Sequence, residues 1–449
     1  MHSPTLGEDF AKVERILADT PSIDKQFGIP TEEFEQRQRR VWQALDRAGF
    51  DAGFVFSDEH YDGDVPYLGG NTNIQIEQVA GVAGRHGFGI IAGLEGGYIA
   101  EQLAPRAKAR VFKAEMLKLA DEEYPINAMR LEDALAEVAG GPVRRLALLS
   151  PRQVIPAAVV EYLERLLGGE NVVDAQEIYY RLKYEKSDNE MRLIADASVI
   201  GDAMMRAMLA VLRPGILETQ VAAWGCLVGR ELGAEEMGWD VMVGASTANR
   251  TLIGKALNRR IEQGDYVHLG VAPKRDGLNS CVRRSCVAVE NPGGMTEDQR
   301  YWFDFVDRAY QAGLDALKDV AAHDKPAWLQ EQALVDFFKS QEPEVRRRLG
   351  RGISLERLKP YTGTHNAGYT ECQEFYGAIT LNSKEPLGRQ IVIMLDVAVR
   401  GIGDHWDDVV IPGMDFVVIE NTCGKTGRAL EELNRLPRNV QPLVGRGAV

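Results

Sequence analysis

Long apolar runs are missing from this sequence of 449 residues, and no stretch approaches the ~20 consecutive apolar residues that span a bilayer. Basic residues are in deficit, because 52 Lys plus Arg against 66 Asp plus Glu give a net charge of 52 − 66 = −14. Phosphate binding requires a surplus of Lys and Arg on one face. We therefore expect neither a membrane nor a nucleic acid as a partner.

Cysteine is scarce as well. Five cysteines in a chain of this length are too few and too scattered for a disulfide scaffold. This usage is typical of a reducing compartment, so a cytoplasmic location is expected. Apolar residues at 45% and charged residues at 26% are ordinary for a globular protein, and the length favours two or three domains.

The periodicity of apolar residues changes near residue 180. Residues 31–180 alternate helical patterns with short apolar strands, which predicts an α/β domain after an N-terminal extension at 1–30. Residues 181–449 contain longer helices and strands, which predict an α+β domain. The helices expected there are 187–212 with Ser187 as N-cap, 218–232, 297–319 and 326–340. The strands expected there are 239–244, 264–272, 281–289, 391–399, 408–411 and 415–420.

Four short motifs occur in a fixed order along residues 31–425. They are Tyr67-Leu68-Gly69-Gly70, Tyr184-Glu185-Lys186-Ser187 followed by Glu190, Pro214-Gly215 followed by Glu218, and Asn258-Arg259-Arg260-Ile261 before Gly264-Asp265. Together they resemble motifs of the creatinase/prolidase/methionine-aminopeptidase superfamily. The resemblance implies a creatinase-type α/β domain at 31–180, a catalytic domain of the pita-bread fold at 181–449, and a homodimer.

Enzymes of this superfamily usually hold two divalent ions with two Asp, one His and two Glu. The resemblance places these five positions at Gly270, Cys281, His365, Asp396 and Asp407. Two divalent ions close together need carboxylates to offset their mutual repulsion, and both Asp are absent. We therefore predict no dinuclear centre and no metal cofactor. The alternative is a single divalent metal on His365, Asp396 and Asp407, with Cys281 as a further ligand.

Creatinase, a metal-independent member of the superfamily, also lacks the acidic pair. This similarity favours a creatinase-like hydrolase that cleaves a C–N bond, of amidine, guanidino or amide type, in a small nitrogen-containing metabolite. In this hypothesis His365 moves a proton, because an imidazole near its reference pKa can do so at neutral pH. Glu371, Asp396 or Asp407 would orient the imidazole or hold a cationic group of the small-molecule substrate.

Five further residues are expected to bind the substrate. Arg283 or Arg284 would clamp a substrate carboxylate in a bidentate manner, and Glu374, Cys281 and His405 would complete the pocket. Two of them have a structural alternative, which is a solvated strand face for Glu374 and a small core residue for Cys281.

Two other functions remain open. One is a mono-metal hydrolase or lyase that acts on a small zwitterion, and the other is a binding protein with a dead pita-bread site. An Xaa-Pro peptidase is the least favoured interpretation, because the acidic pair that it needs is absent.

Overall fold

The computed structural model describes residues 5–75, 77–119, 127–251, 253–290, 292–359, 362–370 and 377–446. The chain forms two compact units, of which one is Gly28–Glu185 and the other combines Met1–Phe27 with Lys186–Val449. Within the described residues, no helix is both long and apolar enough to cross a bilayer. The first unit has α/β architecture and the second α+β architecture, which confirms the predicted fold class.

The N-terminal unit is built on a mixed sheet of six strands in the order β4-β3-β2-β1-β5-β6. Its strands are β1 (Ala52–Ser57), β2 (Val79–Gly84), β3 (Gly87–Ala92), β4 (Arg110–Lys113), β5 (Leu146–Leu148) and β6 (Val172–Asp174). Its helices are α2 (Thr31–Arg47), α3 (Asp64–Gly69), α4 (Gly96–Leu103), α5 (Leu131–Ala139), α6 (Ala157–Leu167) and α7 (Gln176–Tyr184). Phe54, Phe56 and Leu148 are among the fully buried side chains of its core.

The N-terminal extension contains a helix that the sequence analysis did not predict. Helix α1 (Thr5–Asp19) packs on the long helix α8 (Asp188–Val211) of the C-terminal unit. Its buried residues Val13 and Ile16 belong to the core of that unit. Residues three positions apart lie on one face of a helix, so Val13 and Ile16 together place that face of α1 against the core.

Besides α1, the described residues of the C-terminal unit form four further α-helices. They are α8, α9 (Glu218–Leu232), α10 (Glu297–His323) and α11 (Trp328–Leu349). Ser187 caps α8 as predicted, since its hydroxyl accepts from the Glu190 backbone N–H at 3.1 Å. The Glu190 carboxylate accepts in return from the Ser187 backbone N–H at 2.7 Å, which completes a capping box.

A curved seven-stranded sheet forms the centre of this unit, in the order β13-β14-β15-β12-β9-β8, with β16 paired to β15. Its strands are β8 (Met242–Ala245), β9 (Tyr266–Val271), β12 (Val282–Val287), β13 (Thr364–Asn366), β14 (Gln390–Arg400), β15 (Phe416–Thr426) and β16 (Ala429–Glu432). Strands β7 (Glu236–Met237), β10 (Pro273–Arg275) and β11 (Leu278–Asn279) form a small separate sheet.

The strand predicted at 408–411 is wrong. Strands β14 and β15 form one long hairpin in which Arg400 pairs with Phe416, so residues 401–415 form its connecting loop. Within this loop, Ile402 and Val409 form an isolated antiparallel β-bridge and not a strand. Short apolar runs inside a loop resemble strands in sequence, because periodicity alone cannot tell them apart.

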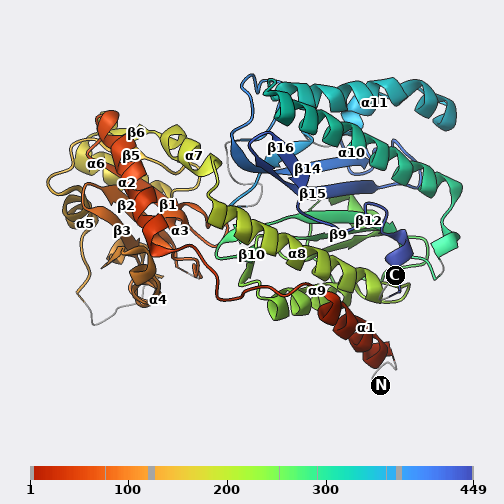
Figure 1. Cartoon of the computed structure of the whole chain (residues 1–449), viewed down its shortest axis with the longest axis horizontal. Helices are drawn as coiled ribbons and strands as arrows, with labels where there is room; N and C mark the ends of the chain where they lie inside the picture. The colour runs from red at the N-terminus through yellow and green to blue at the C-terminus, as the bar shows by residue number, and fades with distance from the viewer. Residues whose placement is uncertain are drawn as a thin grey trace. The chain divides into compact units, whose positions relative to one another are not determined.

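The two faces of the large sheet differ in character. Helix α8 packs against β9 and β12, and α10 packs against β14, β15 and β16, as Figure 1 shows. The apolar core under α8 includes Leu269 and Val282, whose side chains point to that face. Because side chains alternate along a strand, the neighbouring residues Gly270 and Arg283 face the opposite side.

Candidate metal centre

Charged residues form a cross-strand row on the face opposite the helices. Asp396 of β14 pairs with Glu420 of β15, Glu420 pairs with Arg283 of β12, and Arg283 pairs with Gly270 of β9. Directly opposed residues in an antiparallel sheet point to the same face. The register therefore brings together residues separated by up to 150 positions in the chain.

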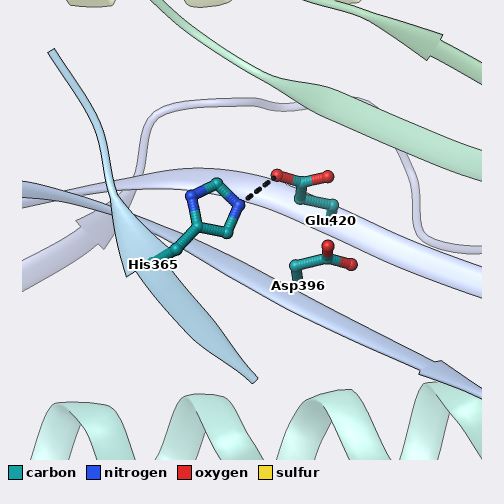
Figure 2. A group of neighbouring side chains, drawn as sticks. All are labelled: His365, Asp396 and Glu420. Carbon is teal, nitrogen blue, oxygen red and sulfur yellow. Dashed lines mark ion pairs between the residues drawn. The ribbon is translucent and has the colours of Figure 1, made fainter. Parts of the chain in front are cut away.

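His365 of β13 completes this group. It pairs with Met394, two residues before Asp396, and so lies on the same face. Ligand atoms of His365, Asp396 and Glu420 all lie within 4.8 Å of one another. Figure 2 shows the three side chains converging from three neighbouring strands. Asp396 and Glu420 are buried, and His365 is half-buried.

The hydrogen bonds of His365 fix which ring nitrogen faces the carboxylates. Its Nδ1 lies 2.9 Å from the backbone carbonyl of Asn366, and a carbonyl only accepts, so Nδ1 carries a proton. Nε2 lies 3.3 Å from Glu420 Oε1 and presents a lone pair to it when the ring is neutral. The lone pair of Nε2 and Glu420 Oε1 would repel each other at this distance unless a proton or a metal ion lay between them. A His whose other ring nitrogen is held by a backbone carbonyl is common at metal sites.

Arg283 supplies a fixed positive charge to the same carboxylates. Its Nη1 lies 2.9 Å from Asp396 Oδ2 and 3.4 Å from Glu420 Oε2. Its Nε donates to His268 Nε2 at 3.0 Å. Burial and then the charge of Arg283 lower the pKa of His268 well below its usual value, so this imidazole is neutral.

The pKa of Glu420 reflects these contacts. Complete burial would raise the pKa, but the contact with His365 and the charge of Arg283 hold it below its usual value. A hydrogen bond from the Cys281 thiol adds a smaller lowering. Among the described residues, Glu420 Oε1 lies within ion-pair distance of His365 Nε2, and no group donates a hydrogen bond of good geometry to it. These contacts favour the ionised form of the Glu420 carboxylate.

A cavity of about 330 Å³ adjoins the centre at His268. Its lining comes from β8, from the 3₁₀ turn Ser246–Thr251, from the following loop and from the β14–β15 loop. The lining residues are Gly244, Thr247, Ala248, Gly254, Lys255, Leu257, Arg259, His268 and Trp406. Two of the described lining residues, Lys255 and Arg259, are basic and none is acidic. Lys255 and Arg259 already have acidic partners outside the lining, in Asp240 at 2.8 Å and Glu218 at 3.8 Å.

The structure separates several residues that the sequence analysis grouped. Asp407 and His405 lie exposed in the loop 401–415 and not with His365 and Asp396. Glu371 and Glu374 lie outside the described residues. Cys281 is buried on the site face, where its backbone N–H donates to the Thr422 hydroxyl at 2.9 Å.

Arg284 points to the face opposite Arg283. It is fully buried and donates to the backbone carbonyls of Glu420 at 2.7 Å, Leu436 at 2.9 Å and Pro437 at 3.0 Å. Desolvation lowers its pKa from the usual value. These contacts tie β15 to the C-terminal segment, and Arg284 touches the centre only through the backbone carbonyl of Glu420.

Glu420 is the member of the centre that the sequence analysis missed. Glu420 ends the apolar run Phe416-Val417-Val418-Ile419, and a charge within an apolar strand needs a partner. That signal was available in the sequence, but it did not show which two acidic residues lie side by side.

Comparisons with known proteins agree with this geometry. The model of Metallopeptidase family M24 matches residues 192–374, a range that includes His365 and ends before Asp396 and Glu420. The Xaa-Pro dipeptidase of Bacillus anthracis has a solved structure that superposes with a TM-score of 0.66 at 17% identity, covering 90% of this chain and 99% of that one. Residues 192–374 thus match the M24 family, and the chain has the two-domain fold of these solved structures.

Two sequence relatives are also peptidases by name. The Xaa-Pro dipeptidase of Pyrococcus horikoshii is 24% identical over 266 residues, which are 59% of this chain and 72% of that protein. The uncharacterized peptidase YqhT of Bacillus subtilis is 24% identical over 263 residues, which are 58% of this chain and 69% of that protein. These likenesses support a hydrolase of C–N bonds.

The comparisons correct two predictions. Metal independence and a creatinase-like character are wrong, because the matching family is one of metallopeptidases. The prediction of no cofactor is wrong for the same reason, and because His365, Asp396 and Glu420 form a group that could hold a metal ion. The second carboxylate, expected at Asp407, is Glu420 in the structure.

The residues present fit one divalent ion. One imidazole with a lone pair at Nε2 and two buried carboxylates form a three-ligand set suited to zinc or manganese. Gly270 offers no side chain, and Arg283 already contacts both carboxylates. The described residues therefore do not provide the set of five protein ligands that a dinuclear centre of this superfamily uses.

Proposed function

We propose that this protein is a metal-dependent hydrolase that cleaves the C–N bond of a small peptide-like substrate, with the ion on His365, Asp396 and Glu420. The observation that carries the proposal is the buried contact between His365 Nε2 and Glu420 Oε1 at 3.3 Å. The match to a metallopeptidase family supports the same class of reaction. The cytoplasmic location and the homodimer remain predictions.

The roles of the residues follow from their contacts. A bound ion would supply a Lewis acid and an activated water to the reaction. Asn366 holds the imidazole of His365 through Nδ1, so that Nε2 stays directed at the carboxylates. Arg283 keeps Asp396 and Glu420 ionised in a buried setting, where an unpaired carboxylate would otherwise take up a proton.

The adjoining cavity fits a substrate of dipeptide size. Its volume of about 330 Å³ lies at the lower end of small-molecule sites. Trp406 provides an apolar aromatic surface, and the basic residues Lys255 and Arg259 favour a carboxylate at one end of the substrate. A dipeptide with a free C-terminal carboxylate has both features.

The test is hydrolysis of a dipeptide panel, which includes Xaa-Pro members, by protein stripped with a chelator and reloaded with Mn²⁺, Zn²⁺ or Co²⁺. We expect turnover with at least one ion, and a loss of at least about 100-fold in kcat/KM in Glu420→Gln. Asp407→Asn is the matched control, because this carboxylate lies exposed in the loop 401–415. If the C–N bond breaks by elimination and not by addition of water, the protein is a lyase. If the dipeptides bind but are not hydrolysed with any of the three ions, the proposal is refuted.

A further inference from the structure

Arg283 lies where the centre needs a second positive charge. We propose that its guanidinium takes the role that a second metal ion has in dinuclear relatives, so that the centre binds one divalent ion per chain. This inference rests on the proposed function, because it takes His365, Asp396 and Glu420 as the ligands of that one ion.

The contacts of Arg283 are those of a bridging cation. A single nitrogen, Nη1, approaches carboxylate oxygens of two different residues, at 2.9 Å from Asp396 and at 3.4 Å from Glu420. All three side chains are at most 6% exposed, so water screens these charges little. Glu420 contacts Arg283 through Oε2, and its other oxygen, Oε1, faces Nε2 of His365.

Gly270 provides the room for this arginine. A Cβ at position 270 would lie 2.7 Å from Met242 Cε, the mobile end of a methionine, and 3.0 Å from Arg283 Cγ. An aspartate at this position, where the superfamily resemblance expects a metal ligand, would therefore crowd Arg283 and require it to shift from its observed position. The missing ligand and the added guanidinium are two parts of one arrangement.

His268 holds the arginine in this orientation. Its Nε2 accepts from Arg283 Nε at 3.0 Å, and the guanidinium carbon lies 5.6 Å from the centre of the Phe416 ring. The ring of Phe416 also packs edge-on against His268, with centroids 5.3 Å apart. The guanidinium of Arg283 is thus held at Nε by His268 and at Nη1 by the two carboxylates.

The charges limit the number of ions. Two carboxylates and one guanidinium sum to −1 with His365 neutral, so one divalent ion brings the centre to +1. A second would bring it to +3 in a buried site, with no compensating anion. Within the described part of the chain, no other His, Cys, Asp or Glu belongs to this group.

The experiment is metal analysis of the chelator-stripped full chain after reloading with Mn²⁺ or Zn²⁺, by mass spectrometry for stoichiometry and by calorimetry for affinity. The wild type should bind one ion per chain in the pocket of His365. Two ions per chain, or two anomalous peaks between β14, β15 and β12 in a loaded crystal, would overturn the inference and leave the proposed function standing. No tightly bound ion would overturn both.

Variants separate an electrostatic role of Arg283 from a merely structural one. Arg283→Met removes the positive charge next to the ligands, so the remaining site should bind its ion at least about 10-fold more tightly. Arg283→Lys keeps the charge and should stay within about 3-fold of the wild type. Weaker binding in Arg283→Met with a native circular dichroism spectrum would contradict the inference. If this variant does not fold, the stoichiometry of the wild type decides the question.

Discussion

Replacement of Arg283 by methionine should destabilise the protein most when metal is absent. The change leaves Asp396 and Glu420 buried without the guanidinium that contacts both. Removing one partner of a buried ion pair costs about 3–5 kcal/mol in the free energy of unfolding, because the remaining charge is uncompensated. In a chelating buffer the variant should therefore lose about that amount relative to the wild type.

A bound ion should recover part of this loss, and more in the variant than in the wild type. An ion that binds only the folded state adds RT ln(1 + [L]/Kd), so a tenfold tighter Kd at the same ion concentration adds about 1.4 kcal/mol. The difference in stability between Arg283→Met and wild type should then shrink by about 1.4 kcal/mol on addition of excess Mn²⁺. Urea denaturation followed by fluorescence, with chelator and with metal, measures both values.

The neighbouring arginine provides the matched control. Arg284→Met removes donors from four backbone carbonyls and should also cost about 3–5 kcal/mol. Its loss should be the same with and without metal, because Arg284 does not contact the carboxylates of the centre. Equal metal responses in both variants, or a loss below about 1 kcal/mol for Arg283→Met in chelator, would refute the reasoning.

Three further changes test separate parts of the structure. Gly270→Ala should cost about 1–3 kcal/mol of unfolding free energy in urea, because its Cβ would lie 2.7 Å from Met242 Cε; an unchanged midpoint would show that the site face has room to spare. Asp64→Asn should cost about 3–5 kcal/mol, because it breaks a fully buried pair with Lys183 at 2.6 Å in the N-terminal unit. Calorimetry should show its metal affinity unchanged, and an altered affinity would contradict the separation of the two units. Asp407→Asn should leave metal affinity within about 2-fold of the wild type, and a tenfold loss would return Asp407 to the ligand set.

The sequence was sufficient for those features that depend on local patterns. The capping box at Ser187 needs only residues within one helical turn, and the alternation around Asp396 marks a buried strand with a charge on one face. The motifs of the superfamily predicted both domains and placed His365. The α/β and α+β architectures follow from the same patterns.

The second carboxylate could not be chosen from the sequence, because it depends on the register of a hairpin. Asp396 pairs with Glu420 only because Arg400 pairs with Phe416 across a loop of residues 401–415. A strand expected at 408–411 implies a much tighter turn and a different register. Asp407 lies near the middle of the actual loop, at the far end from the paired strands.

The cross-strand row also explains why single positions misled the sequence analysis. Gly270 and Cys281, taken one at a time, are lost metal ligands and indicate a degraded site. In the structure Gly270 leaves room for Arg283, since a Cβ there would lie 3.0 Å from the arginine Cγ. Arg283 in turn is what allows Asp396 and Glu420 to remain charged in a buried site with one ion or with none. The replacements are therefore coupled through charge and volume, and restoring an aspartate at Gly270 alone should fail to restore a second ion while Arg283 remains.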